Sequence, residues 1–452
     1  MILRGLKCFQ VDAGKVSAAF PSARREEEGD KVQFPKSKLL HTKRVSPTIG
    51  LNGKNEPPPK LEGTMHQRLN RREFIQGLGT AAAGAYLGPS ILLGSTSPTS
   101  SLPAAPVAVA KCMQYGPGVR TALATMFDQL GGLERLVRGK TVAIKLNLTG
   151  EPNDKLRGLP LGMTHWVHPD VIAATVNLLG DAGARRIRLL ECSASPSTSL
   201  QDFMSSAGWN PSEFASAAPR VEFEDTNYAG PSGRYVRFKV PDGGMLFKTY
   251  DLNHSYADCD VYLSLAKLKE HSTAGVTLSM KNSFGITPVT IYGSGAGVNE
   301  PATVARGFRS MLHDGGRQPS KTASPEINPS SPRDPGYRVP RVTADLAGAR
   351  PIQLAVIDGI YSMAGGEGPW VSNGRPVHPG LLIAGTNPVN VDSVSTALMG
   401  FDPMAERGTA PFEGCDSTLM LAERAGIGTR DLKRIEVIGV PIAQAKMSFR
   451  AA

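Results

Sequence analysis

Residues 258–288 read DCDVYLSLAKLKEHSTAGVTLSMKNSFGITP. The first part predicts a buried β-strand, because an apolar run over residues 261–266 follows the acidic residues Asp258 and Asp260. Polar and titratable side chains follow at once, from Lys267 to Asn282. In an open α/β sheet the ligand binds beyond the carboxyl ends of the strands. This stretch therefore predicts a strand that ends in a ligand-binding segment.

Strand and helix patterns alternate along the chain on both sides of this stretch. Further strands are expected at residues 106–111, 140–148, 186–191, 351–358, 381–384 and 435–440. Helices are expected at residues 119–130, 169–183, 342–349 and 388–399. Strands that alternate with helices favour an α/β fold with a mainly parallel sheet that helices cover on both faces.

Two regions lack this periodicity. Residues 211–241 are expected to be irregular or to form a hairpin. Residues 293–340 are rich in Gly, Ser, Pro and charge, and only residues 304–313 suggest a short helix. A weakly structured segment of this length inside a domain is usually a lid, a binding loop or a disordered excursion. The sequence thus predicts a long irregular insertion in the α/β domain.

Four parts of the chain differ in composition. Residues 1–64 show no sustained periodicity. We interpret them as a disordered extension, or as the result of a translation start wrongly assigned upstream of Met65. We expect residues 65–105 to hold a signal segment, with Arg71 and Arg72 before a weakly apolar stretch, and a Ser/Thr/Pro-rich linker. Residues 106–442 are expected to form the α/β domain, and residues 443–452 a tail.

The net charge of +10 is concentrated near the N-terminus. Up to Arg72 the chain carries 15 Lys and Arg against 7 Asp and Glu, whereas the rest carries 35 against 33. A nucleic-acid-binding face needs clustered excess positive charge. The folded body has no such excess, so we expect no nucleic-acid partner.

The sequence lacks the motifs of several common cofactor sites. The cysteines are Cys8, Cys112, Cys192, Cys259 and Cys415, and their spacing matches no iron–sulfur or zinc motif. Those in the body could pair in an oxidising compartment, but buried free thiols are the interpretation we favour. No phosphate-binding G-x-x-x-x-G-K-[ST] loop is present, which argues against nucleotide hydrolysis.

Residues 70–76, NRREFIQ, resemble the twin-arginine export motif. A weakly apolar, glycine-rich segment follows at residues 77–94. The resemblance implies that the twin-arginine translocation machinery exports the folded protein to a periplasmic or other extracytoplasmic location. The alternative is an ordinary amphipathic helix after a basic patch. No later apolar run reaches the ~18–20 residues of a membrane-spanning helix, so we expect no stable span.

Titratable and amide side chains near the predicted strand ends are the candidate site residues. The catalytic candidates are His271, which titrates near neutral pH, and Lys281, which could act as a base or nucleophile. The candidate ligands of a small anionic substrate are Lys145, Asn147, His165, His168, Lys267, Lys269 and Asn282. The carboxylates that could bind a divalent metal are Asp358, Glu367 and Asp392. For each residue the alternative is local capping, packing or a solvated loop.

Five pieces of the chain together resemble the DUF362 family, a domain of unknown function. They are residues 142–147, 164–183, 258–285, 358–368 and 387–392. The resemblance implies an α/β domain, which in this family sometimes lies beside ferredoxin-type cluster motifs. This chain contains no such motif, and the family implies no settled reaction or cofactor.

The segment HSTAG at residues 271–275, followed by Lys281, is similar to a segment of nickel-pincer lactate racemases. There a His-x-x-Ala-Gly stretch precedes the lysine that holds the cofactor. The resemblance implies that Lys281 corresponds to that lysine and His271 to a catalytic base. The chain departs from that group at residues 277–280, TLSM, where the group has glycines; bulky side chains there could block a close backbone approach.

Three classes of function are compatible with these residues. The first is an exported enzyme that acts on a small anionic organic substrate with a bound metal or cofactor. The second is an accessory protein that binds the same kind of ligand without turnover. The third is a scaffold in a redox complex, with an exposed apolar patch near residues 293–340. We favour the enzyme, which predicts that His271, Lys281 and the three carboxylates converge in one pocket.

Overall fold

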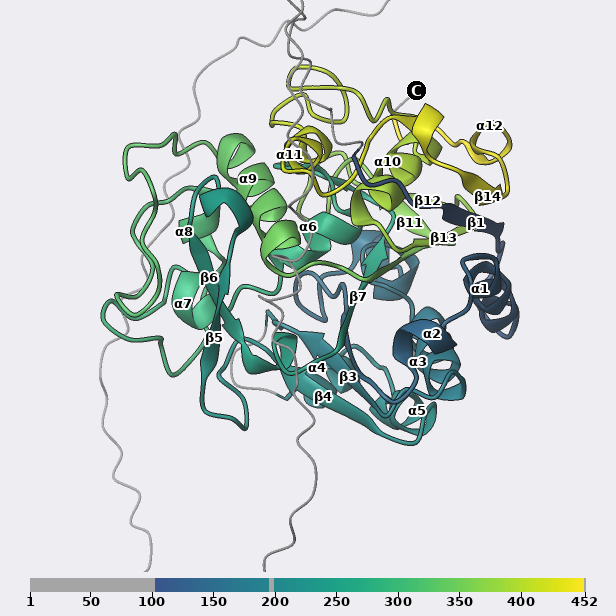
Figure 1. Ribbon diagram of the computed structural model, residues 1–452, viewed down its shortest axis with the longest axis horizontal. Coiled ribbons are helices and arrows are strands. Elements are labelled where there is room, and N and C mark those ends of the chain that lie inside the picture. The colour runs from purple at the N-terminus through teal and green to yellow at the C-terminus, as the bar shows by residue number, and fades with distance from the viewer. Residues whose placement is uncertain (1–101, 195–198, 451–452) are drawn as a thin grey trace, which may run out of the picture. The chain divides into compact units, whose positions relative to one another are not determined.

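The computed structural model describes residues 102–194 and 199–450. The predicted extension over residues 1–64 and most of the predicted signal and linker over residues 65–105 lie outside these residues. The described part contains an eight-stranded sheet with the order β14-β1-β13-β10-β7-β2-β3-β4 (Figure 1). Its strands are β1 (Val107–Lys111), β2 (Thr141–Lys145), β3 (Arg186–Glu191), β4 (Val221–Asp225), β7 (Val261–Lys267), β10 (Leu354–Gly359), β13 (Leu381–Gly385) and β14 (Val437–Gly439).

All neighbouring strands of this sheet are parallel except at β13. β13 runs antiparallel to both β1 and β10. The other pairs are parallel, so the carboxyl ends of β10, β7, β2 and β3 lie at one edge. The predicted fold class, an α/β fold with a mainly parallel sheet, is confirmed.

Helices cover both faces of the sheet. On one face lie α1 (Gly118–Gln129), α2 (Glu134–Val137), α3 (Pro169–Asp181), α4 (Leu200–Ser206) and α5 (Pro211–Ser216). On the other lie α6 (Leu278–Phe284), α7 (Val289–Tyr292), α8 (Ser310–His313), α9 (Pro335–Ala349), α10 (Pro388–Leu398) and α12 (Ile442–Ala445). A smaller apolar cluster joins α11 (Thr418–Arg424) to α9 and α10. In Figure 1, α1, α3 and α5 lie on one side of β7, and α6, α9 and α10 lie on the other.

Each central strand contributes side chains to both cores. In β7, Leu263 and Leu265 pack on the α1–α5 side, whereas Tyr262 and Ala266 pack on the α6–α10 side. All four are fully buried. Burying a large apolar side chain contributes ~1.5–3 kcal/mol, so a strand apolar on both faces is stable only between two helical layers. This explains why the apolar run of the sequence is nearly continuous.

Several helices begin at a polar cap followed by proline. His168, Asp334 and Asn387 accept hydrogen bonds from the first backbone N–H groups of α3, α9 and α10 respectively. Proline is favoured at the first helical position because its missing N–H has no partner there in any case. The predicted starts at residues 169 and 388 are confirmed. α9 begins seven residues earlier than the predicted 342 and continues through Pro340, which the sequence analysis took as the end of the insertion.

The prediction for residues 211–241 is wrong in part. Residues 221–225 form β4, which pairs in parallel with β3 at the edge of the sheet. Its sequence, VEFED, is half-buried and charged, so it lacks the apolar signature of a central strand. β5 (Tyr235–Lys239) pairs with β6 (Thr249–Asn253) as a separate antiparallel ribbon. Two smaller ribbons are β8 (Glu270–His271) with β9 (Gly275–Val276), and β11 (Ser362–Ala364) with β12 (Arg375–Val377).

The long insertion is irregular, as predicted, apart from α8 and the first six residues of α9. It is held to α9 by buried polar contacts. Glu326 forms ion pairs with Arg338, which is fully buried, and with Arg333. Arg338 also donates to the carbonyl of Met311 at 2.9 Å. These contacts fix a segment that has few apolar residues.

The four described cysteines are free thiols, and three of them are buried. This agrees with the interpretation favoured from the sequence. Among the residues that the structure describes, no helix combines the length and apolar character needed to cross a membrane.

Replacement of Glu326 by glutamine should destabilise the protein, because it leaves the Arg338 guanidinium buried without its charge partner. Removing one member of a buried ion pair costs about 3–5 kcal/mol. Denaturant unfolding measures the effect, with Glu300→Gln, an exposed position of the same insertion, as the control. Equal stability of the two variants would contradict this role for the buried pair.

Candidate functional site

A cavity of about 400 Å³ lies at the carboxyl ends of parallel strands of the main sheet. Lys145, the last residue of β2, and Glu191, the last residue of β3, both line it. β7 leads into the loop that carries His271 and then into α6, which carries Lys281. The position agrees with the prediction of a ligand site beyond the carboxyl end of β7.

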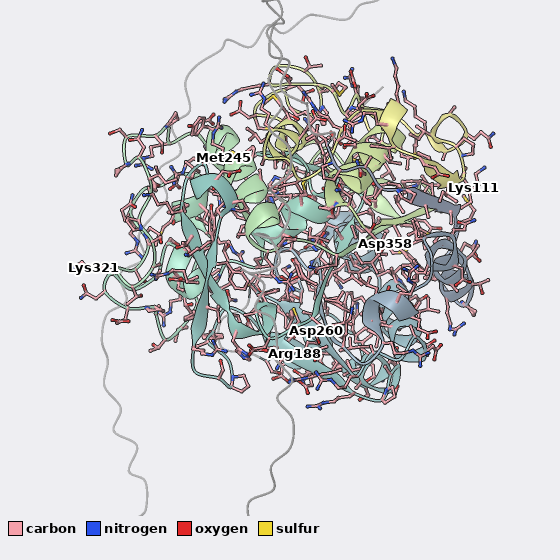
Figure 2. The ribbon with its side chains drawn as sticks, viewed as in Figure 1. Lys111, Arg188, Met245, Asp260, Lys321 and Asp358 are labelled. Atoms are coloured by element: carbon pink, nitrogen blue, oxygen red, sulfur yellow. The ribbon has the colours of Figure 1, made fainter. Side chains whose placement is uncertain are left out.

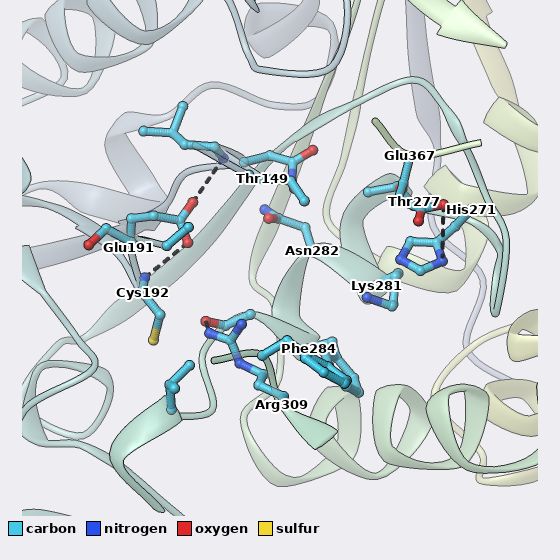
Figure 3. A pocket seen from close by; sticks show the side chains of 18 of the residues that line it. Thr149, Glu191, Cys192, His271, Thr277, Lys281, Asn282, Phe284, Arg309 and Glu367 are labelled. Atoms are coloured by element: carbon cyan, nitrogen blue, oxygen red, sulfur yellow. Dashed lines mark hydrogen bonds and ion pairs between the residues drawn. The ribbon is translucent and has the colours of Figure 1, made fainter. Parts of the chain in front are cut away.

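Half of the predicted site residues line this cavity. They are Lys145, Asn147, His271, Lys281, Asn282 and Glu367. Figure 3 shows Glu191 and Cys192 across the cavity from His271 and Glu367, with Lys281 between the two groups. The predicted residues that do not line the cavity are His165, His168, Lys267, Lys269, Asp358 and Asp392.

Lys145 is neutralised within the protein. Its Nζ lies 2.5 Å from Oε1 of Glu191 and donates to the carbonyl of Leu146 at 2.6 Å. Oε2 of Glu191 accepts the backbone N–H of Leu148 at 2.9 Å. Both charged side chains are buried. Lys145 therefore lines the cavity with its charge already paired.

Asn282 joins α6 to the sheet. Its amide Nδ2 lies within hydrogen-bonding distance of the carbonyl of Lys145 (3.2 Å) and the hydroxyl of Ser264 (3.0 Å). Asn147 has a similar bridging role, since its Oδ1 accepts the backbone N–H of Lys267 at 3.3 Å. Both side chains line the cavity, but most of their hydrogen bonds are made to other groups of the protein.

The start of α6 is fixed by Asp392. Its Oδ1 accepts the backbone N–H and the hydroxyl of Ser279, at 2.9 and 2.6 Å, and its Oδ2 accepts the N–H of Met280 at 2.9 Å. The preceding residue, Leu278, has φ 47°, a left-handed conformation that costs a non-glycine residue energy. Burial raises the pKa of Asp392 to about 7 against these hydrogen bonds. Asp392 is thus a positioning residue for α6.

Lys281 lines the cavity, and its amine has no hydrogen-bond partner among the described residues. Its Nζ lies 4.1 Å from the ring centroid of Phe284. Burial lowers its pKa to about 7; the Glu367 carboxylate opposes this shift, and Arg309 and Lys145 add to it. A lysine amine in this state can accept or donate a proton near neutral pH.

His271 lies beside Glu367. Nδ1 of His271 accepts the backbone N–H of Thr273 at 3.2 Å, which places the ring proton on Nε2. Burial and the charge of Lys281 lower the pKa of His271 well below its usual value, although Glu367 opposes them. Glu367 Oε2, 3.9 Å from Nδ1, accepts the N–H and hydroxyl of Ser272. Although burial alone would raise the pKa of Glu367, His271 and these hydrogen bonds hold it below its ordinary range.

Among the lining residues from the insertion are two titratable side chains that the sequence analysis missed, Arg309 and His313. Arg309 donates to the carbonyls of Thr287 at 2.7 Å and Gly285 at 3.0 Å. Its remaining guanidinium nitrogen, Nη1, has no partner among the described residues. His313 Nδ1 lies 2.8 Å from the carbonyl of Arg309, so Nδ1 carries the proton and Nε2 is an acceptor. Burial and Lys281 lower the pKa of His313 to about 4.

Aromatic side chains complete the lining of the cavity. Trp370 and Phe308 both line it and are 50% and 59% exposed. The indole N–H of Trp370 donates to Glu367 at 2.9 Å, which fixes the ring. Glu191 follows the same strand-end rule that identified Lys145, so the sequence carried a signal for it. Arg309 and His313 follow no strand and carried none.

Lys267 and Asp358 form a separate buried cluster with Tyr115. Lys267 Nζ lies 2.9 Å from Asp358 and 3.0 Å from the hydroxyl of Tyr115, which itself donates to Asp358 at 3.0 Å. Asp358 also accepts the backbone N–H of His168 at 2.9 Å, and the His168 ring stacks on Tyr115. Lys267, Asp358 and Tyr115 satisfy one another, so this cluster braces the ends of β7 and β10.

Lys269 and His165 lie behind the cavity. Lys269 Nζ donates at 2.8 Å to the carbonyls of both His165 and Glu367, which ties together the loops that follow β2 and β11. Burial lowers the pKa of Lys269 to about 7 and that of His165 to about 2. Both residues support the cavity from outside.

The three predicted metal ligands do not form one group. Asp358 is bound by Lys267, Glu367 by Ser272 and Trp370, and Asp392 by the start of α6. Among residues 102–194 and 199–450, no cluster of three or more His, Cys, Asp or Glu side chains is arranged to hold a metal ion. The geometry therefore offers no metal centre built from these carboxylates.

The residues at 277–280 do not close the cavity. Leu278 and Met280 are buried in the apolar clusters, and Ser279 bonds to Asp392. Of these residues Thr277 alone lines the cavity. The obstruction by bulky side chains that the sequence suggested is therefore absent at Leu278 and Met280, and the Lys281 amine stays open to the cavity.

The pKa of Lys281 can be measured directly. After reductive methylation with isotopically labelled formaldehyde, the NMR signal of Lys281 should titrate with a midpoint near pH 7, because burial disfavours the ammonium form. The Lys281→Arg variant assigns the signal, and exposed lysines in the same spectrum serve as controls. A midpoint near 10, the ordinary value for lysine, would contradict the electrostatics described above.

Comparisons with known proteins match this chain to a sequence relative and to solved structures. A thylakoid-associated protein of Synechocystis sp. is 25% identical over 300 residues, which are 66% of this chain and 75% of that protein. The lactate racemase apoprotein of Thermoanaerobacterium thermosaccharolyticum aligns with a TM-score of 0.31 and 12% identity over 60% of this chain. A Thermotoga maritima protein aligns with a TM-score of 0.29 and 13% identity over 55% of this chain.

The chain spans about half of each of these two solved structures, 54% and 52%, and likenesses this low carry no argument about function. The family model described as a domain of unknown function (DUF362) matches residues 142–397, more than half of the chain. These residues include all of β2 except Thr141, together with β7, α6 and the entire lining of the cavity. The chain therefore belongs to the DUF362 family.

Proposed function

We propose that the protein is an enzyme that binds a small organic anion in this cavity and transfers a proton to or from it. The observation that carries the proposal is the Lys281 amine, which faces the cavity without a hydrogen-bond partner among the described residues. Lys281 is half-buried, so an anion that enters the cavity could bind the ammonium form of its side chain directly. The unpaired Nη1 of Arg309 adds a second donor for an anionic group.

His271 is the candidate general acid or base. Its Nε2 carries the proton and is not bound by any described residue, so it is available to a substrate. Glu367, 3.9 Å from Nδ1, would stabilise the ring if it gained a proton during the reaction. Acid–base groups within one cavity support an enzyme more than a scaffold, for which scattered and solvated candidates are expected.

Proton exchange at carbon separates an enzyme from a binding protein. Protein purified from its own host should accelerate exchange of the methyl hydrogens of pyruvate in deuterated water, followed by NMR within a panel of small carboxylates. His271→Gln should slow this exchange about 100-fold or more, the usual contribution of a proton donor in general acid–base catalysis. The matched control is His378→Gln, whose ring lies outside the cavity lining. If a carboxylate binds but none exchanges, the accessory-protein alternative replaces the enzyme.

We also propose export by the twin-arginine route. The support is the motif at residues 70–76 and the apolar segment after it, both outside the described residues. The protein would then reach its compartment already folded, with this cavity complete.

A fusion of residues 1–105 to a reporter tests export. We expect the reporter in the extracytoplasmic fraction of a bacterium that has twin-arginine machinery, because the arginine pair is the recognised element. Substitution of Arg71 and Arg72 together by lysine should abolish this, whereas Arg68→Lys should not. Export of the double variant at the unaltered level would reject the proposal.

A further inference from the structure

We propose that Lys281 is a nucleophile that forms an imine with a small 2-oxo acid, an organic acid with a ketone carbon beside its carboxylate. The inference rests on the proposed function of the cavity and specifies its substrate class.

The geometry distinguishes Lys281 from the other lysines at this edge of the sheet. Lys145 is paired with Glu191, Lys267 with Asp358, and Lys269 donates to two carbonyl oxygens. Each of these amines donates its hydrogens to oxygen acceptors of the protein. Lys281 has a phenyl ring as its nearest partner and no oxygen acceptor among the described residues.

The surroundings of Lys281 favour the neutral amine, which is the reactive form. Burial and the nearby charges of Arg309 and Lys145 disfavour the ammonium ion, whereas the Glu367 carboxylate favours it. Lysines become nucleophiles in proteins by this combination of an apolar contact and neighbouring cations. About half of the Lys281 side chains should therefore be neutral near pH 7.

Arg309 suits the carboxylate of such a substrate. Two of its nitrogens are fixed by the carbonyls of Thr287 and Gly285, so the guanidinium cannot turn away. The free Nη1 can then donate to a carboxylate oxygen, a charge-assisted hydrogen bond. An acid with its ketone carbon next to the carboxylate presents that carbon near Arg309, in the cavity that Lys281 also lines.

The two histidines of the lining have complementary protonation. His313 Nε2 is an acceptor, and His271 Nε2 is a donor. His313 can take a proton from the attacking nitrogen, and His271 can donate a hydrogen bond to the oxygen that leaves. The pair therefore suits the movement of protons from nitrogen to oxygen that imine formation requires.

The step balances without a further reactant. The lone pair of the Lys281 nitrogen forms a bond to the ketone carbon, and the carbonyl π electrons move to oxygen. The nitrogen then loses both of its hydrogens to that oxygen, which leaves as water as the C=N bond forms. No atom is oxidised or reduced, and hydrolysis reverses the step.

Borohydride trapping tests the inference. The full-length protein is incubated with pyruvate and sodium borohydride, which reduces the C=N bond to a stable secondary amine, and peptides are mapped by mass spectrometry. We expect one reduced pyruvate adduct, at Lys281. Lys281→Arg should abolish it while keeping the positive charge, and Lys239→Met, at an exposed lysine of β5, should leave it unchanged. Arg309→Gln should reduce the extent of trapping about tenfold, the size of one charge-assisted hydrogen bond.

Pyruvate binding, followed by the fluorescence of Trp370 with Trp370→Phe as control, separates the possible failures. Binding without an adduct at Lys281 would overturn the imine and leave the anion site intact. Adducts spread over exposed lysines would also overturn it, since they would show that the reaction with pyruvate is not specific to Lys281. If the protein forms no adduct at Lys281 and binds neither pyruvate nor any other small carboxylate, both the imine and the proposed function are overturned. Circular dichroism of each variant verifies that its fold is retained.

Discussion

The carboxylate of Asp392 holds the first turn of α6, and the candidate site depends on that contact. Two backbone N–H groups and one hydroxyl of residues 279–280 bind this single buried side chain. The contact stabilises a turn in which Leu278 has a left-handed backbone. The helix that follows carries both Lys281 and Asn282, so the direction of these two side chains is set by an acid more than 100 positions later in the chain. In this geometry Asp392, predicted as a metal ligand, binds the start of α6 and is not grouped with the other predicted metal ligands.

Some of the positively charged side chains at this edge of the sheet are paired within the protein and others are not. The unpaired ones mark the candidate site. Three buried lysines are matched by oxygen acceptors, at a desolvation cost that those contacts offset. The Lys281 amine and Nη1 of Arg309, in contrast, have no hydrogen-bond acceptor among the described residues. Lys281 and Arg309 are only half-buried, so these two donors are reached by water in the cavity and are open to an anion that binds there. Burial is the main cause of the low pKa of Lys281; the Glu367 carboxylate opposes the shift, and the charges of Arg309 and Lys145 add to it.

Much of the fold could be predicted from the sequence, because the central strands carry a strong signal. A strand buried on both faces must be apolar nearly throughout, and β2, β7 and β10 have that property. The edge strand β4 was missed because half-buried charged residues give no such signal. α9 was predicted too short because Pro340 normally ends a helix, whereas here the helix continues through it.

The site was harder to predict than the fold. Strand ends indicated Lys145, His271 and Lys281 correctly as cavity residues, since the carboxyl edge of a parallel sheet is shared. The same rule also selected Lys267 and Asp358, which lie at strand ends but bind each other. Sequence position cannot tell a paired charge from a free one. Arg309 and His313 lie in the irregular insertion, whose path over the cavity depends on tertiary contacts such as the buried Glu326–Arg338 pair.

A crystal structure with bound oxalate would test the central claim most directly, because oxalate has the charge of a small organic acid and no ketone carbon to react. The account predicts the dianion in the cavity, with one carboxylate on Lys281 Nζ and hydrogen-bonded to Nη1 of Arg309. Oxalate bound elsewhere on the protein, with Lys281 and Arg309 unoccupied at saturating concentration, would contradict it.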